Sequence, residues 1–198
     1  MSAELRADAI AILGLMNLPR VGTVTIHHIL DALRERDTAV RYLLEYDATS
    51  LVSEALLSEK QAEMFVSNEQ RDWREATIDQ LDAGNVQLLP ITSPDYPACL
   101  HEKRPPMQPP LLMVRGDASL LELGGIAFAG ARRASPHGLE FTRALVTRAV
   151  EQTFSVISGG AAGTDIESHQ VALANGGSTV VVLAEGIGTA AAVRIARR

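Results

Sequence analysis

The chain contains 198 residues, of which 46% are hydrophobic and 21% are charged, the ordinary composition of a soluble globular protein. This length suffices for one large domain or two small ones with a buried core. No apolar run approaches the ~20 residues that a membrane-spanning helix needs, and the start MSAELRADAI lacks the pattern of a secretion signal. The lone Cys99 excludes an internal disulfide and a cysteine-based zinc cluster. We therefore expect a cytoplasmic protein with no attachment to a membrane.

The net charge of −6 is distributed unevenly along the chain. Residues 1–93 contain 8 Lys or Arg against 15 Asp or Glu, whereas residues 94–198 contain 10 against 9. This balance argues against a globally basic nucleic-acid binder. Aromatic residues make up only 4% of the chain, so binding of a single strand would depend on phosphate contacts more than on base stacking. Any phosphate site is expected to be local and to lie in the second half.

The first 85 residues predict an all-α bundle. Apolar residues recur at helical spacing over residues 3–16 and again after Thr23, the expected N-cap of a second helix. The segment between these helices is the turn LPRVG (Leu18–Gly22), and helix, turn, helix of this kind is similar to one half of a helix-hairpin-helix or SAM-like unit. Because the surroundings are acidic and Arg20 is the only cation near the turn, we interpret the turn as an ordinary helical corner. Further helices are expected at Leu51–Leu57, Glu59–Val66 and Asn68–Ala83.

The pattern changes at residue 86, where Val86–Ile91 predicts a short strand. Leu111–Val114 predicts another strand. Between them, residues 94–110 contain six prolines, which argues against a helix or a central strand and predicts an extended segment docked on the domain that follows. We therefore place the domain boundary between residues 85 and 86, with the second domain covering residues 86–198.

The second domain predicts an α/β fold with a Rossmann-like parallel sheet. Apolar strands alternate with helices in the order Ile126–Ala129 (strand), Pro136–Glu151 (helix), Phe154–Ile157 (strand), Ile166–Ala174 (helix) and Thr179–Leu183 (strand). The third strand is rich in β-branched residues, as is typical of a buried parallel strand. Thr189–Arg198 is expected to begin another helix. A complete doubly wound sheet has about five or six strands, so we expect the chain to be a C-terminally truncated form of a longer protein.

Glycine-containing turns follow the first two of these strands. Glycine allows the backbone to approach an anion closely, and the N–H groups at a helix start carry partial positive charge. Because the carboxyl ends of neighbouring parallel strands meet at one edge of a sheet, the two turns should form one crevice suited to phosphate. Glu185, in the turn after the third strand, is the carboxylate expected to face this crevice. The candidate phosphate-binding residues are Gly130, Arg132, Ser135, Ser158, Gly159, Gly160 and Gly163.

Individual side chains near the turns have competing interpretations. We favour phosphate binding for Arg132, whose guanidinium can form two parallel hydrogen bonds, and a surface ion pair for Arg133. Ser158 either donates its hydroxyl to an anion or caps the next helix. Asp165, near a helix start, is better explained as a cap than as a base. His169 lies four residues further on, so a structural Asp–His pair on one helix face is expected.

Several segments in the second half of the chain resemble motifs of the DprA/Smf family of bacterial DNA-processing proteins, and they occur in the same order and at the same spacing as in that family. The resemblance begins at Asp95 and covers the rest of the chain. Glycine-rich turns are common, and the specificity comes from the order and spacing of the segments together. The segments are YPxxL (Tyr96–Leu100), PPLLMVRGD (Pro109–Asp117, similar to PPxxLYxxG), GARRASPHG (Gly130–Gly138, similar to GSRxxSxYG), ISGGAAGTDIESH (Ile157–His169, similar to ISGxAxGIDxxAH) and ALANGGSTVVVLAEGI (Ala172–Ile187, similar to ALxxGGxTIAVLGxG).

The resemblance implies a domain that binds single-stranded DNA through its phosphates, protects incoming DNA during natural transformation and loads a RecA-type recombinase. It implies a homodimer without catalysis and without a cofactor. Residue by residue, Arg132 matches the motif arginine that grips phosphate, while Ser158, Gly159 and Gly163 match the phosphate-facing turn. Ala131 replaces the motif serine, which removes one hydroxyl donor. The second half of the family's sheet has no counterpart in this sequence.

A hypothesis of a different class is an enzyme or sensor for a nucleotide-derived small molecule. SGGAAGTDIE (Ser158–Glu167) resembles the PGGxGTxxE motif of nucleotide phosphoribohydrolases of the lysine-decarboxylase-like group, in which Glu167 would take part in hydrolysis of an N-glycosidic bond. The spacing from glycine to acid differs, and no second carboxylate–arginine pair is visible to support acid–base chemistry. His27 and His28 have no companion ligands for a metal. A third alternative is a degenerate member that retains the fold without either activity.

Overall fold

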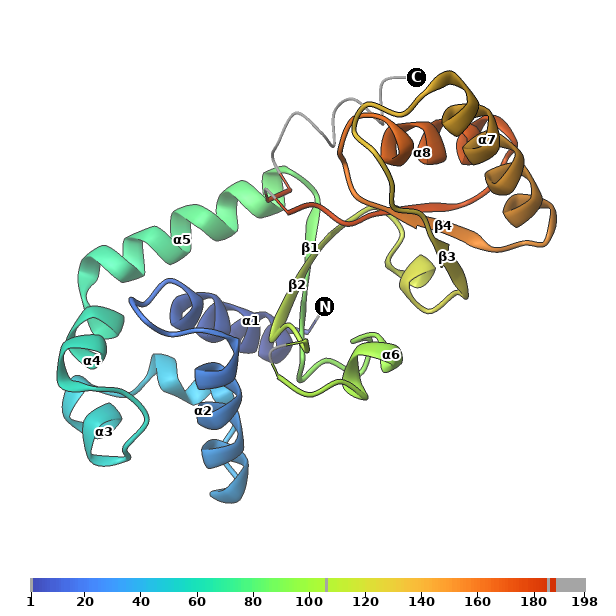
Figure 1. Ribbon diagram of the computed structural model, residues 1–198. Helices are drawn as coiled ribbons and strands as arrows, with labels where there is room; N and C mark the ends of the chain where they lie inside the picture. The colour runs from blue at the N-terminus through green and yellow to red at the C-terminus, as the bar shows by residue number, and fades with distance from the viewer. Residues whose placement is uncertain (1, 106, 185, 188–198) are drawn as a thin grey trace. The chain divides into compact units, whose positions relative to one another are not determined.

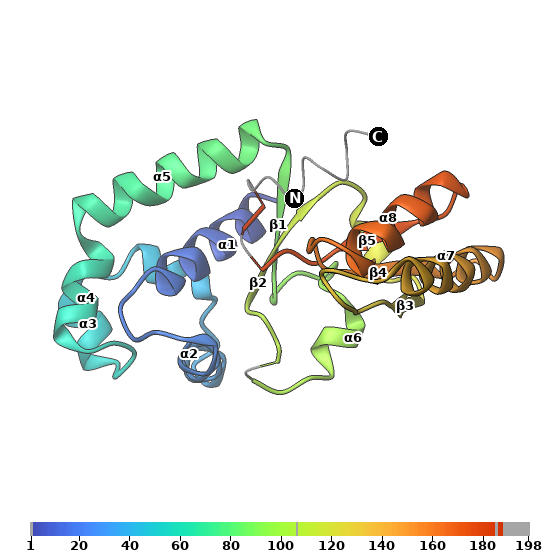
Figure 2. The ribbon, with the colours of Figure 1, turned by 45° about the horizontal axis from the view of Figure 1, so that its top comes forward.

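The computed structural model describes residues 2–105, 107–184 and 186–187 (Figure 1). The chain divides into two compact units, one ending at Gly116 and the other beginning at Asp117. Each unit has its own hydrophobic core, and Figure 2 shows their elements from a second direction. No helix in the described part of the chain is long and apolar enough to cross a membrane. The expected carboxylate Glu185 and the expected helix Thr189–Arg198 lie outside the described residues.

The first unit is mainly helical, as expected. Its helical elements are α1 (Ala3–Met16), α2 (Thr23–Glu35), the 3-10 helix η1 (Val40–Leu44), α3 (Ala48–Ser53), α4 (Glu59–Val66) and α5 (Asn68–Ala83). The prediction of a helix at Leu51–Leu57 is wrong in position, because the carboxylate of Asp47 accepts from the backbone of Ser50 and starts α3 earlier. Thr23 is the first helical residue of α2, and the N-cap is Gly22.

Helix α1 forms the centre of the first unit's core. It contacts α2, η1, α5 and the strand β1 (Val86–Pro90). Its apolar side chains are buried on more than one face, and Ile12 and Leu15 are fully buried. Full burial of an aliphatic side chain of this size contributes roughly 1.5–3 kcal/mol. Packing around α1 therefore holds the elements of the unit together.

A two-stranded hairpin completes the first unit. β1 pairs antiparallel with β2 (Leu111–Arg115), with Leu88 opposite Met113. Leu88 and Leu111 belong to the same core as the helices. The compact unit thus extends to Gly116 and does not end at residue 85, where the change in local pattern led us to expect a boundary. Local strand propensity begins at residue 86, but the apolar face of the hairpin packs on the helices that precede it.

The proline-rich segment contains one turn of helix, α6 (Ala98–His101), where we expected none. Prolines lie on either side of this turn and do not interrupt it, so no helical N–H is lost. The segment docks, but on the first unit. Tyr96 is 2% exposed, and its hydroxyl donates to the carbonyl of Pro109 at 2.6 Å. Nε2 of His27 on α2 lies 2.8 Å from the carbonyl oxygen of Gln108.

The second unit confirms the expected α/β class. Its elements are the 3-10 helix η2 (Ala118–Leu121), β3 (Gly125–Ala127), α7 (Pro136–Glu151), β4 (Ser155–Ser158), α8 (Thr164–Ala174) and β5 (Thr179–Val181). Among the described residues these strands form a parallel three-stranded sheet in the order β3-β4-β5. Helices α7 and α8 pack against each other and against β4 on one face of the sheet (Figure 1). Val146, Val156 and Ala172 form the buried centre of this packing.

Candidate functional site

Two glycine-containing turns lie against each other at the carboxyl ends of β3 and β4. A side chain at Gly130 would collide with Thr164 at the start of α8, and one at Gly163 would collide with the carbonyls of Ala131 and Arg132. The backbone N–H of Thr164 donates to the carbonyl of Ala131 at 3.3 Å. The structure therefore brings the two turns together, as expected for neighbouring parallel strands. They are the first turn, residues 128–135, and the second turn, residues 159–163.

Gly163 ends the second turn and is the N-cap of α8. Its backbone has φ +82° and ψ −129°, a conformation that residues with a Cβ rarely adopt. This conformation allows α8 to begin directly beside the first turn. The helix carries no side-chain N-cap, so part of the need for hydrogen-bond acceptors at its start is met by the carbonyl of Ala131.

Arg132 and Arg133 in the first turn are both exposed. Across the described part of the chain, no carboxylate forms an ion pair with either guanidinium. The ion pair that we expected for Arg133 is therefore not formed by any described residue. An exposed guanidinium without a carboxylate partner, next to glycine backbone, is suited to bind an oxyanion.

Ser135 is the N-cap of α7, as predicted. Its Oγ accepts from the backbone N–H of Gly138 at 3.1 Å, and Pro136 occupies the first helical position. The side chain is exposed. Because the cap uses a lone pair of the oxygen, the hydroxyl hydrogen of Ser135 can still be donated outward.

Ser158 has a role that neither sequence interpretation foresaw. It is 5% exposed, and its hydroxyl donates to the carbonyl of Phe128 at 2.6 Å. The cap of α8 is Gly163, so Ser158 does not cap that helix. The single hydroxyl hydrogen joins the end of β4 to the start of the first turn, and Ser158 helps to hold the two turns together.

His169 on α8 is fully buried and contacts the second turn directly. Its Nε2 lies 2.8 Å from the carbonyl oxygen of Gly159, and its Nδ1 lies 2.6 Å from Oγ1 of Thr179 on β5. The expected hydrogen bond to Asp165 is wrong, because both ring nitrogens face other partners. Burial lowers the pKa of His169, although the Gly159 carbonyl and the charge of Asp165 oppose this shift.

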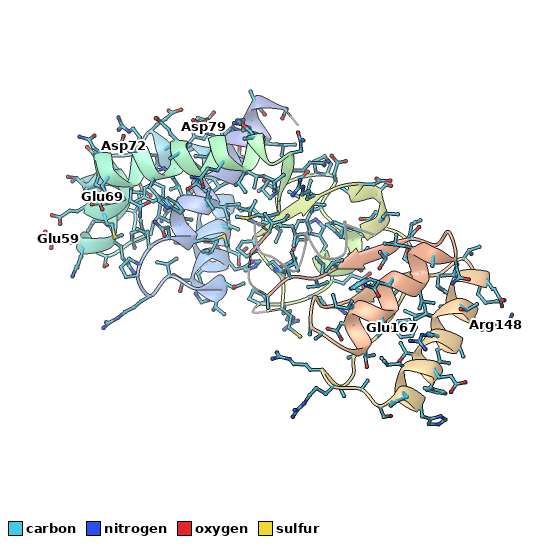
Figure 3. The ribbon with its side chains drawn as sticks, turned by 90° about the horizontal axis from the view of Figure 1, so that it is seen from above. Glu59, Glu69, Asp72, Asp79, Arg148 and Glu167 are labelled. Carbon is cyan, nitrogen blue, oxygen red and sulfur yellow. The ribbon has the colours of Figure 1, made fainter. Side chains whose placement is uncertain are left out.

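Carboxylates flank the second turn. Oδ2 of Asp165 lies 2.7 Å from the position that a Cβ on Gly159 would take. Glu167, labelled on α8 in Figure 3, forms an ion pair with Arg143 on α7. The carboxylate of Glu167 is thus held by a guanidinium, whereas that of Asp165 places a negative charge beside the glycine backbone. The pairing of Glu167 with Arg143 was not visible in the sequence, because 24 residues separate the two.

Comparison with known proteins places these turns in a defined family. A family model described as DNA recombination-mediator protein A matches residues 87–195, more than half of the chain. The chain belongs to this family. The match includes both turns of the second unit, and it also includes the hairpin β1–β2 that packs on the helices of the first unit.

Curated relatives in the family match part of the chain. The protein Smf of Synechocystis is 35% identical over 107 residues, which are 52% of this chain and 26% of that protein. The DNA processing protein DprA of Streptococcus pneumoniae is 33% identical over 79 residues (40% and 28%), and that of Bacillus subtilis 30% over 102 residues (51% and 34%). The matches thus span about a quarter to a third of these relatives.

A solved structure shows the same fold. The X-ray structure of DprA from Streptococcus pneumoniae superposes with a TM-score of 0.69 at 21% identity, covering 94% of this chain and 62% of that one. The same fold therefore extends over helices α1–α5, which precede the residues of the family's sequence match.

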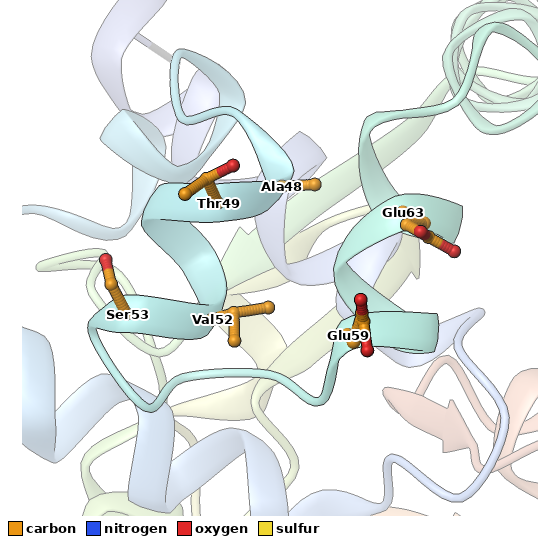
Figure 4. A pocket seen from close by; sticks show the side chains of 6 residues that line it. All are labelled: Ala48, Thr49, Val52, Ser53, Glu59 and Glu63. Carbon is orange, nitrogen blue, oxygen red and sulfur yellow. The ribbon is translucent and has the colours of Figure 1, made fainter.

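The first unit has surface hollows both outside and within the family's sequence match. One lies between α3 and α4 (Figure 4). The residues that line it are Ala48, Thr49, Val52, Ser53, Glu59 and Glu63. All six precede the matched residues 87–195. The described residues contain no group of three His, Cys, Asp or Glu side chains that could hold a metal ion.

Proposed function

We propose that the protein binds single-stranded DNA through its phosphates, with the two glycine-containing turns as the contact site. The observation that carries the proposal is the juxtaposition of these turns beside Arg132, an exposed guanidinium without a carboxylate partner among the described residues. The backbone of Gly130, Gly159, Gly160 and Gly163 allows a close approach of phosphate oxygens.

The biological setting follows from the family. Relatives in Streptococcus pneumoniae and Bacillus subtilis carry the name DNA processing protein. We assign this chain a role in DNA processing during transformation and recombination, in which bound single strands are protected and passed to a RecA-type recombinase by a homodimer. The role is non-enzymatic in this proposal, and it places the protein in the cytoplasm.

The test is a fluorescence-anisotropy titration of labelled oligo-dT at 50 and 200 mM salt. Phosphate binding should weaken steeply as salt rises, with a slope of about −0.7 per phosphate contact on a single strand. Arg132→Ala should reduce the affinity at least about tenfold and flatten this slope, because a charged hydrogen bond is worth roughly 1.5–3 kcal/mol.

Arg148→Ala is the matched control. Arg148 is labelled on α7 in Figure 3, is exposed and pairs with Glu151 on its own helix. The substitution removes the same charge from the second unit at a position outside both turns, so it should change the affinity by less than about twofold. Equal losses for the two variants would contradict a specific phosphate site. Release of nucleobase from nucleotides, abolished by Glu167→Gln, would instead support the hydrolase alternative.

A further inference from the structure

The imidazole of His169 forms the centre of a buried hydrogen-bond chain that connects four elements of the second unit. His169 belongs to α8 and reaches the carbonyl of Gly159 in the second turn and Oγ1 of Thr179 on β5. Thr179 in turn lies 2.9 Å from the carbonyl oxygen of Val156 on β4. The imidazole is fully buried. The second turn is therefore tied to the sheet through one side chain.

The partners determine where the imidazole carries its hydrogen. A carbonyl oxygen can only accept, so Nε2 of His169 must carry a hydrogen and donate it to Gly159. In the neutral ring, Nδ1 then accepts, and the single hydroxyl hydrogen of Thr179 is shared between Nδ1 and the carbonyl oxygen of Val156. Burial of the ring lowers the pKa of His169 and favours this neutral form.

The bond to Gly159 determines the direction of the next amide. The carbonyl of Gly159 and the N–H of Gly160 belong to one planar peptide group and point in opposite directions. Because the imidazole holds the carbonyl inward, the N–H of Gly160 points away from the buried ring. Among the described residues, the structure records no hydrogen-bond acceptor for this N–H.

We infer that His169 is a positioning residue of the phosphate site, because it holds the Gly159 carbonyl inward and thereby aims the Gly160 N–H at the bound phosphate. This role rests on the proposed function of the turns. His169 does not contact the DNA itself, since its side chain is buried. Its effect is to keep the peptide group in one orientation before the anion arrives, which spares the site a reorganisation on binding.

Two substitutions at His169 separate positioning from simple filling of the core. In His169→Gln, the side-chain amide nitrogen reaches the place of Nε2 and can still donate to the Gly159 carbonyl. In His169→Asn, the shorter amide reaches only the place of Nδ1, near Thr179, and leaves the carbonyl unpaired. Both variants replace the ring by a neutral amide, so their difference reports the bond to Gly159.

The first readout is oligo-dT affinity at fixed salt, with melting temperature as the check on folding. We expect His169→Gln to bind within about twofold of the parent protein and His169→Asn to bind at least about fivefold more weakly, the range of one lost hydrogen bond. Equal affinities for two folded variants would overturn the inference. If His169→Asn does not fold, Thr179→Val replaces it as the test, because it removes the hydroxyl that contacts Nδ1. Thr179→Val should weaken binding by about twofold to fivefold, and unchanged binding would overturn the inference.

The second readout separates this inference from the proposed function. The ¹⁵N–¹H signal of Gly160 is followed while inorganic phosphate is added to the parent protein and both variants. A shift of this signal in the parent protein and in His169→Gln, but not in His169→Asn, supports the positioning role. This holds even if no variant binds oligo-dT, because a failure to bind oligo-dT would reject only the DNA proposal. The positioning role is overturned if the Gly160 signal does not respond in the parent protein, or if it responds equally in the parent protein and both variants.

Discussion

Gly163 of the second turn lies directly against the carbonyl oxygen of Ala131 in the first turn, with no room for a Cβ between them. This contact makes the two turns a single rigid unit, because neither backbone can move without displacing the other. It also explains why a glycine is needed at this position in the fold. The dihedral φ +82° excludes most side chains, and the neighbouring carbonyl excludes the rest.

Replacement of this glycine should be costly. Gly163→Ala is expected to lower the free energy of unfolding by about 3 kcal/mol or more, because it adds a backbone clash to an unfavourable φ. Gly176→Ala is the matched control, since Gly176 also has positive φ (+71°) but has no atom within 4 Å of an added Cβ. The control should cost only about 1–2 kcal/mol. Urea unfolding followed by far-UV circular dichroism gives both values, and equal losses would contradict the close contact.

Removal of the Asp165 charge should strengthen binding of phosphate. The carboxylate lies beside Gly159 in the second turn and opposes an anion there. Asp165→Asn is expected to raise oligo-dT affinity about twofold to fivefold at low salt, the range of a single charge near a helix start. Glu140→Gln removes one negative charge from the exposed surface of α7 and serves as the control. An equal gain in both variants would indicate a general field effect and not a local one.

The stability of the protein should fall as the pH is lowered below neutral. Burial lowers the pKa of His169 in the folded protein. As the pH falls to the usual histidine pKa of 6.5, the imidazole is therefore protonated in the unfolded chain but stays neutral in the folded chain. The contribution of His169 is therefore fully present above about pH 7 and is lost as the pH falls through 6.5 towards the folded pKa. Urea unfolding at pH 7.5, 6.5 and 5.5 measures this loss. His169→Gln should show a shallower dependence, and an identical one would contradict the assignment.

The carboxylate of Asp8 should be important for the stability of the first unit. Asp8 is 3% exposed and accepts hydrogen bonds from the backbone and side chain of Arg41 and from the hydroxyl of Thr92 at 2.8 Å. Asp8→Ala leaves these donors unpaired and is expected to destabilise the protein by about 2–3 kcal/mol. Glu4→Ala, which removes an exposed carboxylate near the same arginine, should change stability by less than about 0.5 kcal/mol. Thermal unfolding of the two variants measures the difference.

Local signals in the sequence were sufficient for much of the second unit. The bounds of α7 were predicted correctly, because Ser135 and Pro136 mark its start and apolar residues recur at helical spacing along it. The three parallel strands were placed to within one or two residues. In the first unit, by contrast, α3 was misplaced because Asp47 was not recognised as its cap. Signals of this kind are carried by neighbouring residues and can be read without the fold.

What the sequence by itself determined was the family, the α/β class and the turns that carry the candidate site, since each depends on the order of residues along the chain. Tertiary structure alone decided that Leu88 and Leu111 join the helical core, that the Ser158 hydroxyl turns inward and that His169 reaches Gly159 rather than Asp165. These outcomes depend on partners that are distant in sequence and on burial, because a buried hydroxyl or imidazole must find its hydrogen-bond partner inside the protein. For this reason the sequence located the turns, whereas the fold determined which of their groups face outward.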